Sequence, residues 1–215
     1  MDKNYVSEAV IRRLPKYYRQ LDEMEKNGIM RISSQELSVM MGLTASQIRQ
    51  DFNCFGDFGQ QGYGYQVTNL KIEISKILGI KQRYSVIIIG AGNVGQALAN
   101  YSGFGKEGFI IKALFDVNPK LIGMSLHGID VLDLDQLEEF ISQDSVHIGV
   151  IATPKAKAQQ VADRLAACGV KGIWNFAPVD VHTGGHVAIE NVHLSDSLYI
   201  LSYRFNQVLE QNSHV

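Results

Sequence analysis

A glycine-rich turn directly after a buried strand is the strongest constraint on how this chain folds. Residues 85–89 contain four branched apolar side chains in a row, which is typical of a strand buried on both faces. Gly90-Ala91-Gly92-Asn93-Val94-Gly95 follows at once and leads into a helical run. The first glycine permits a tight turn, the second lets backbone amides approach a pyrophosphate, and the third allows the helix to pack closely on the strand. We therefore predict a Rossmann-type α/β fold in which all six residues contact a dinucleotide at the helix N-terminus.

An acidic residue at the end of the next predicted strand indicates which dinucleotide binds. Residues 110–115 form a second apolar run, and Asp116 closes it 21 residues after Gly95. An acid here suits the 2′-hydroxyl of an adenosine ribose and would repel a 2′-phosphate, so we predict NAD(H) rather than NADP(H). A simple turn or cap is the alternative role for Asp116. Thr153 follows another buried strand, 147–151, and is expected to reach the cofactor at the same sheet edge.

Composition limits the other possibilities. The chain has 215 residues, enough for one large or two modest domains, and a net charge of −2, so any nucleic-acid surface must be local. Cys54 and Cys168 lack the spacing of metal ligands and form no disulfide framework. We find no signal peptide and no apolar run of about 18 residues that would span a bilayer. These features favour a cytoplasmic protein without a metal site or membrane contact.

The N-terminal region has the pattern of a helix-turn-helix. Ser33 and Glu36 have capping-box spacing, and the short helix that they open ends at Gly42. A second capping box, beginning at Thr44, opens another short helix. Two short helices around a glycine turn are typical of DNA-binding helix-turn-helix units, and the second helix enters the major groove. The side chains that it would project toward DNA are Ser46, Gln47, Arg49 and Gln50.

The flanking segments complete a predicted winged helix-turn-helix domain over residues 1–80. Residues 7–27 are helical in period, with Pro15 expected to start a second helix. The glycine-rich segment 56–65 suggests the hairpin tip of a wing, although an unpaired loop is the alternative. Residues 68–79 form a closing helix capped near Thr68 or Asn69, with Leu70, Ile74, Ile77 and Leu78 facing inward. With ten basic and nine acidic residues, this domain should bind DNA in a salt-sensitive way and as two copies.

The remaining chain continues the nucleotide fold over residues 81–194. Residues 118–123 suggest a turn into a short helix, and helices are expected at 135–142 and 155–168. A strand is expected at 171–175, and Val187-Ala188-Ile189 and Val192 can add final strands. A C-terminal helix over 195–215 carries a narrow apolar seam at spacings of four and three, namely Leu194, Leu198, Leu201, Phe205 and Val208. Such a seam suits either packing on its own domain or pairing with a second subunit.

Catalytic residues are not evident. A dehydrogenase needs an acid or base held over the nicotinamide, and little chain remains to build a catalytic domain. The six histidines show neither paired ligand spacing nor a triad partner, so we interpret each as a surface or packing residue. We therefore predict no enzyme activity.

This combination of domains resembles the Rex family of redox-sensing transcriptional repressors. The resemblance covers nearly the whole chain, and its motifs are jointly specific. They are 13–19 (Arg-Leu-Pro-Lys-Tyr-Tyr-Arg), 48–52 (Ile-Arg-Gln-Asp-Phe), Phe55-Gly56, 62–65 (Gly-Tyr-Gly-Tyr), 89–95, Phe115-Asp116 and 172–178 (Gly-Ile-Trp-Asn-Phe-Ala-Pro).

The resemblance implies a homodimer with swapped terminal helices that binds palindromic operator DNA when NAD⁺ prevails and releases it when NADH binds. Closure around NADH would rotate the recognition helices out of register with the major grooves. Further expected DNA contacts are Tyr63 in the wing and Lys16, which belongs to a cluster of basic residues around Pro15 with Arg12, Arg13 and Arg19. Arg19 and Tyr101 match family positions that link DNA binding to the nicotinamide pocket, so Tyr101 is also an expected cofactor contact.

The chain departs from the family pattern at several positions. His193 stands where the third partner of Arg19 and Tyr101 is usually an acid, with Asp196 the nearest acid. Gln50 and Gln60-Gln61 replace basic residues, and Cys54 replaces an aromatic one. Fewer phosphate contacts would weaken DNA binding or its salt dependence.

Two other functions fit parts of the pattern. The first is a small NAD-dependent oxidoreductase with an accessory N-terminal domain, which hydride transfer to a substrate would reveal. The second is a DNA-binding protein that senses a different phosphorylated ligand. Binding of NADH, NAD⁺ and NADPH, compared with operator release, separates the three possibilities.

Overall fold

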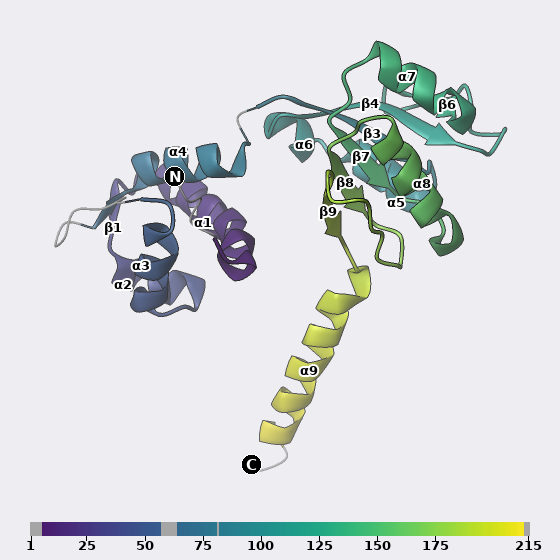
Figure 1. The fold of residues 1–215 in the computed structure, drawn as a ribbon. Helices are drawn as coiled ribbons and strands as arrows, with labels where there is room; N and C mark the ends of the chain where they lie inside the picture. Colours follow the sequence, from purple (N-terminus) through teal and green to yellow (C-terminus); the bar gives the residue numbers. More distant parts are fainter. Residues whose placement is uncertain (1–5, 57–63, 81, 213–215) are drawn as a thin grey trace. The chain divides into compact units, whose positions relative to one another are not determined.

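The computed structural model describes residues 6–56, 64–80 and 82–212. Contacts divide the chain into two compact units, Met1–Gln82 and Arg83–Val215 (Figure 1). The first unit contains a two-stranded antiparallel sheet and four described helices. Its elements are α1 (Glu8–Lys26), β1 (Arg31–Ile32), α2 (Ser34–Met41), α3 (Ala45–Asn53), β2 (Tyr65–Gln66) and α4 (Val67–Leu78).

Helix α1 runs unbroken through Pro15, so the prediction of a second helix starting there is wrong. Proline inside a helix removes one backbone hydrogen bond and usually costs about 3 kcal/mol. Here Leu14, Tyr17 and Leu21 are buried along one continuous face of α1. Their packing against α3 and α4 holds the helix together across the proline, since tertiary packing supplies most helical stability in proteins.

The helix-turn-helix forms as predicted. The Ser33 hydroxyl accepts a hydrogen bond from the Glu36 amide at 3.1 Å, and the Ser33 amide donates to Glu36 Oε2 at 2.8 Å, which confirms the first capping box. Gly42 ends α2 with φ of 64°. The second box is only half formed: the Thr44 hydroxyl accepts from the amide of Gln47, whose side chain binds elsewhere.

The wing prediction falls mostly on residues 57–63, which lie outside the described residues. At its base, β1 pairs with β2, and Gly64 has φ of 69°. A Cβ there would lie 2.6 Å from the Ile32 carbonyl oxygen. Helix α4 begins at Val67 without a side-chain cap, because the Val67 amide donates to the Met30 carbonyl.

The α4 cap near Thr68 or Asn69 is therefore wrong, and so is the inward placement of Ile77, which is 39% exposed. Leu70 and Ile74 are buried as predicted.

A buried carboxylate joins α1 to α3. Asp51 is fully buried and accepts hydrogen bonds from Arg13 Nε at 2.6 Å, Arg13 Nη2 at 2.8 Å, the Tyr17 hydroxyl at 2.8 Å and Gln47 Nε2 at 3.0 Å. Burial alone would raise the pKa of Asp51, but the hydrogen bonds from Arg13, Gln47 and Tyr17 outweigh it and lower that pKa. The carboxylate therefore stays ionised inside the unit.

Removing the Tyr17 hydroxyl tests this network. We expect Tyr17→Phe to lower the free energy of unfolding by about 1.5 kcal/mol, because a hydrogen bond to a buried charge is lost. The pKa of Asp51 is lower in the folded protein than in the unfolded chain, where it is about 4. The ionised Asp51 therefore stabilises the fold fully above pH 4, and this stabilisation is lost as the pH falls through the pKa of the folded state. Urea unfolding from pH 7 to pH 3 measures both effects. Ser46→Ala, which removes an exposed hydroxyl, is the control, and equal stability of wild type and Y17F at pH 7 would contradict the account.

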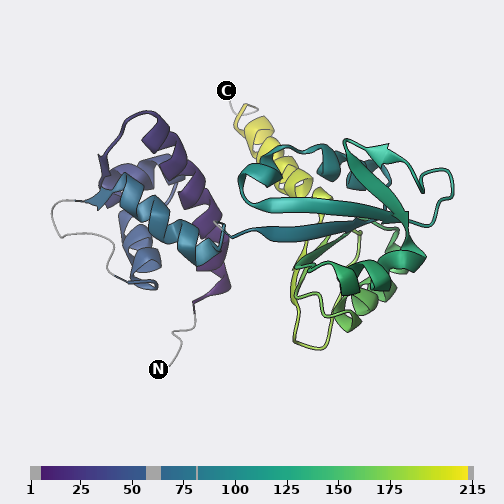
Figure 2. The same ribbon diagram turned by 90° about the horizontal axis from the view of Figure 1, so that it is seen from above.

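The second unit is built on a seven-stranded sheet of order β5-β6-β4-β3-β7-β8-β9, parallel except for β5 (Figures 1 and 2). Apolar clusters cover both faces. Its strands are β3 (Tyr84–Ile89), β4 (Phe109–Asp116), β5 (Ser125–Leu126), β6 (Ile129–Asp133), β7 (Ile148–Ile151), β8 (Gly172–Asn175) and β9 (Ala188–Asn191). Its helices are α5 (Asn93–Asn100), α6 (Gly103–Lys106), the 3₁₀ turn η1 (Leu134–Gln136), α7 (Leu137–Gln143), α8 (Lys155–Ala167) and α9 (Leu194–Asn212).

This order confirms the Rossmann-type fold, with small local differences from the sequence prediction. Residues 118–123 form a hydrogen-bonded turn instead of a short helix, with the Leu121 amide donating to the Asn118 carbonyl at 2.9 Å. The Asn118 side chain is also committed, since it accepts from the Lys120 amide. Strand β5, which the sequence did not suggest, follows this turn and pairs antiparallel with β6.

Candidate functional site

The candidate dinucleotide site lies where the sheet order reverses. Strands β3 and β7 are neighbours, and their chain continuations lead to opposite sides of the sheet, which is the topological switch point where α/β folds bind ligands. A cavity of about 710 Å³ lies there. Six of the predicted cofactor contacts line it, namely Gly90, Gly92, Asn93, Val94, Asp116 and Thr153.

The three glycines of the turn have different roles. Gly90 has φ of 105°, and a Cβ there would lie 2.5 Å from the Ala152 carbonyl oxygen on the loop after β7. A Cβ on Gly95 would overlap the Gly90 carbonyl oxygen. Gly92, by contrast, has φ of −77°, and a Cβ added to it would meet no described atom within 4 Å. The missing side chain of Gly92 therefore leaves open space above the turn.

The N-terminus of α5 points its donors at this space. Gly92 is the N-cap of α5, and none of the described side chains caps the helix. The first amides of a helix have no intrahelical acceptor, and the positive end of the helix dipole lies beside them. Open space and unpaired donors together fit a pyrophosphate. Ala91 is fully buried, and its amide donates to Asp116. Ala91 and Gly95 therefore shape the turn, whereas the other four residues of the turn line the cavity.

Asp116 ends β4 beside the turn. Its Oδ2 accepts from the Ala91 amide at 2.7 Å and its Oδ1 from the Asn118 amide at 2.8 Å. Asp116 therefore caps its own turn, which was the alternative interpretation of the sequence. A carboxylate has about four acceptor sites, so two remain for ribose hydroxyls, and Asp116 still lines the cavity.

Thr153 supplies a second sign that this cavity binds a polar ligand. Its Oγ1 is buried, and none of the described residues forms a hydrogen bond with it. Buried hydroxyls almost always have a partner. The orphaned oxygen lies on the loop after β7, directly across from Gly90. A ligand in the cavity would provide the missing partner.

Helix α8 contributes cavity residues that sequence reasoning missed. They are Lys157, Gln160, Val161 and Arg164, which recur at spacings of three and four and so share one face of the helix. Arg164 is held by Glu138, with both N–O distances at 2.8 Å, and it also donates to the Leu134 carbonyl. The hydrogen bond from Arg164 lowers the pKa of Glu138. The helical spacing after Thr153 was the signal that could have identified this face.

The residues expected to transmit the redox signal lie in both units. Tyr101 follows α5, is 60% exposed and packs edge-on against Phe104 at 4.7 Å between ring centroids. His193 Nε2 lies 2.8 Å from Asp180 Oδ1. Asp180 is thus the acid that accompanies His193, whereas Asp196 was the nearest acid in the sequence. Arg19 is exposed on α1, and its link to Tyr101 stays a prediction.

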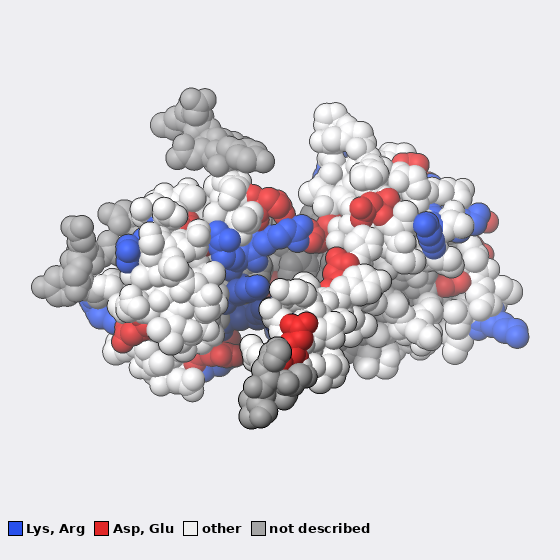
Figure 3. Space-filling model, turned by 90° about the horizontal axis from the view of Figure 1, so that it is seen from below, with Lys and Arg blue, Asp and Glu red and all other residues white. Residues whose placement is uncertain are grey.

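The candidate DNA-binding face is α3 and its surroundings. Ser46, Arg49 and Gln50 are exposed on α3, and Lys16 is exposed on α1. Arg49 donates to the Ser34 hydroxyl at 2.9 Å, which leaves other guanidinium donors available. Tyr63 lies outside the described residues. Figure 3 shows both basic and acidic side chains among neutral ones on the face that it displays.

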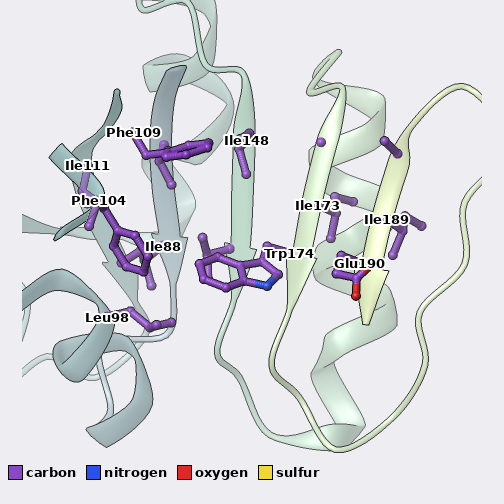
Figure 4. Close-up of a pocket in the computed structure, with 14 residues that line it drawn as sticks. Ile88, Leu98, Phe104, Phe109, Ile111, Ile148, Ile173, Trp174, Ile189 and Glu190 are labelled. Carbon is purple, nitrogen blue, oxygen red and sulfur yellow. The ribbon is translucent and has the colours of Figure 1, made fainter. Parts of the chain in front are cut away.

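A second, apolar cavity of about 460 Å³ lies on the sheet and is lined by residues from β4 across to β9. Figure 4 shows Trp174 lying across it between Ile88 and Glu190, with Leu98 and Phe104 at one side. Helix α9 is exposed from Leu194 to Gln211, so it does not pack on its own domain.

The apolar surface of α9 is also broader than the predicted narrow seam. Leu198, Tyr199, Ile200 and Leu201 are each more than half exposed. Four consecutive residues point in different directions around a helix, so apolar side chains surround this part of α9.

Comparison with known proteins identifies the family. The chain is 57% identical over 204 residues to the redox-sensing transcriptional repressor Rex of Clostridium novyi (strain NT), which covers 95% of this chain and 97% of that protein. It is 56% identical to the Rex of Clostridium botulinum (strain Alaska E43 / Type E3), over 96% and 99% of the two chains. The chain belongs to the Rex family of redox-sensing transcriptional repressors.

Solved Rex-family structures share the same fold. A crystal structure of RSP in complex with β-NAD⁺ and operator DNA is 53% identical, covers 97% of this chain and 96% of that one, and gives a TM-score of 0.90. The complex of RSP with β-NADH gives 0.89 at 50% identity, over 98% and 99%. Family models match residues 5–53 as a putative DNA-binding protein N-terminus and 81–179 as a CoA binding domain. These matches cover the helix-turn-helix and most of the nucleotide fold of this chain.

Two further findings concern the part of the chain that the structure describes. No helix there is long and apolar enough to cross a membrane. No group of three or more His, Cys, Asp or Glu side chains is arranged to hold a metal ion.

Proposed function

We propose that this Rex-family chain is a homodimeric repressor that binds double-stranded operator DNA when NAD⁺ prevails and releases it when NADH binds. The observation that carries the proposal is the cavity at the glycine turn, with open space at Gly92, the uncapped α5 and the Thr153 oxygen that no described residue pairs with. The RSP complexes with β-NAD⁺ and operator DNA and with β-NADH support the same ligands here. Such a repressor would act in the cytoplasm, where bacterial DNA lies.

The residues of the cavity have separate roles in this proposal. The α5 amides hold the pyrophosphate, Asp116 accepts from ribose hydroxyls, and Thr153 meets a polar atom farther along the cavity. Tyr101 would contact the nicotinamide end and act with Arg19 and His193 in the switch. NADH must bind the two conformations of the dimer with different affinities, since equal affinity would shift nothing.

The proposed dimer rests on two exposed apolar surfaces of the chain, helix α9 and a cavity on the sheet. Helix α9 exposes apolar side chains over its 19 residues, about 28 Å, and the sheet presents an apolar cavity from β4 to β9. A helix that is apolar around its circumference is normally buried. We infer that α9 of each subunit covers the apolar cavity of the other, which gives a closed, two-fold arrangement.

Calorimetric titration with NADH, NAD⁺ and NADPH tests the proposed ligands. The proposal requires NADH and NAD⁺ to bind and NADPH to bind far more weakly. The competing assignment, a small NAD-dependent oxidoreductase, requires hydride transfer, which loss of NADH absorbance in the presence of candidate carbonyl substrates would detect. Absence of any dinucleotide binding would end both and favour a different phosphorylated ligand.

Replacing Asp116 tests cofactor discrimination. We expect Asp116→Asn, with its single oxygen on the Ala91 amide, to lose the acceptor for the Asn118 amide and the negative charge that repels a 2′-phosphate. The preference for NADH over NADPH should fall about tenfold, the effect of one charge contact on the order of 1.4 kcal/mol. Fluorescence titration with both nucleotides measures the ratio. An unchanged ratio would show that Asp116 only caps its turn.

A further inference from the structure

The carboxylate of Asp51 fixes which way an amide on the recognition helix faces. Asp51 accepts four hydrogen bonds, two on each oxygen. An ionised carboxylate can only accept, so the atom of Gln47 that lies 3.0 Å from Asp51 Oδ1 must be the nitrogen Nε2. The amide oxygen of Gln47 is consequently the end directed away from Asp51. The orientation of the Gln47 amide is therefore set by its hydrogen bond to the carboxylate of Asp51.

Gln47 also holds the position from which a recognition helix reads bases. It is the third residue of α3, is partly exposed, and follows the Thr44 cap. Residues at the N-terminus of such a helix contact base edges in the major groove. None of the described residues donates a hydrogen bond to Gln47 Oε1, and none accepts from the second N–H of Nε2. The amide of Gln47, held by Asp51, thus presents Oε1 as an acceptor and the second N–H of Nε2 as a donor, side by side.

We propose that Gln47, held by Asp51, is a specificity-determining residue that selects an adenine in each operator half-site. This inference rests on the proposed operator binding. Adenine offers N6–H as donor and N7 as acceptor, which match Oε1 and the remaining N–H. Guanine offers two acceptors, so only one hydrogen bond forms, and cytosine offers a donor alone. Asp51 itself is a positioning residue, since it is buried and touches DNA only through Gln47.

The test compares base preference with overall affinity. Operator half-sites selected from random DNA by the wild-type dimer are rebuilt with each of the four bases at every position, and affinities are measured at one salt concentration. We expect the wild type to prefer adenine at one position per half-site by about tenfold or more. Gln47→Met should abolish the preference there and nowhere else. Gln35→Met makes the same change at an exposed position of α2 and should leave the preference unchanged.

A double-variant comparison tests the role of Asp51. The asparagine of Asp51→Asn can both donate and accept hydrogen bonds, so it no longer fixes the orientation of the Gln47 amide. The preference for adenine should therefore fall. In Gln47→Met the same Asp51→Asn change should have no further effect on base preference, although it lowers affinity. Circular dichroism shows whether each variant is folded. If Asp51→Asn is unfolded, the comparison of base preference between the wild type and Gln47→Met decides alone.

Two results would overturn the inference: an equal loss of affinity for all four bases in Gln47→Met, or a base other than adenine at the affected position. In either case NADH-dependent release of the selected DNA would leave the proposed function intact. If the wild type selects no sequence at all, operator binding itself fails.

Discussion

Replacing Leu201 by glutamate is expected to convert the dimer into monomers and to weaken operator binding by more than about 100-fold. Leu201 is 60% exposed in the single chain, so the charge does not disturb the fold of the subunit. In the proposed dimer it would be buried against an apolar surface, where an unpaired charge is strongly unfavourable. Two linked recognition helices gain about 10²- to 10⁴-fold in avidity over one, and this gain disappears with the dimer.

Light scattering on an eluting size-exclusion peak measures the mass, and anisotropy of labelled operator measures the affinity. Asn206→Glu is the matched control, because it adds the same charge at an exposed polar position of α9. It should remain dimeric and bind DNA normally. NADH binding should persist in both variants, since the glycine turn belongs to a single subunit. A dimeric L201E protein with unchanged operator affinity would refute the role of α9.

Replacing Gly92 by alanine should abolish most NADH binding while leaving the fold intact. The backbone at Gly92 has φ of −77°, which alanine adopts without strain, and no described atom lies within 4 Å of the added Cβ. The methyl group instead enters the space where the pyrophosphate approaches the α5 amides. Loss of two charge-assisted hydrogen bonds should weaken NADH binding on the order of 100-fold, about 2.7 kcal/mol.

Thermal unfolding and calorimetric titration distinguish this effect from damage to the fold. Gly105→Ala on α6 is the control, since its Cβ also meets no described atom within 4 Å, and it should bind NADH normally. Gly95→Ala should behave differently from G92A: its Cβ overlaps the Gly90 carbonyl oxygen, so the melting temperature falls as well. Full NADH affinity in a folded G92A protein would contradict a pyrophosphate site at this turn.

The parts of the site that the sequence predicted are those that depend on local backbone chemistry. The glycine turn, Asp116 and Thr153 come together because each lies at the carboxyl end of a parallel strand, and these ends meet at one edge of the sheet. The first capping box and Gly42 are equally local, and they placed the helix-turn-helix correctly. Local signals of this kind need no knowledge of the tertiary contacts.

The errors concern features that distant residues decide. Pro15 stays inside α1 because a face that includes Tyr17 packs on other helices. His193 meets Asp180, 13 residues away, because the loop before β9 returns to the sheet edge. The side chain of Gln47 was expected to complete the capping box of α3. It instead donates a hydrogen bond to Asp51 on the same helix, and Arg13 of α1 holds Asp51 in place. No periodicity in the sequence reports these partners.

The most direct test of the central claim is a titration of the operator-bound dimer with NADH and, separately, with NAD⁺. Fluorescence anisotropy of the labelled operator follows the bound fraction at constant salt. We expect NADH to release the DNA at concentrations that fill the glycine-turn cavity, with NAD⁺ leaving it bound, and G92A to require far more NADH. Operator that stays bound at saturating NADH, or that NAD⁺ releases equally well, would contradict the account.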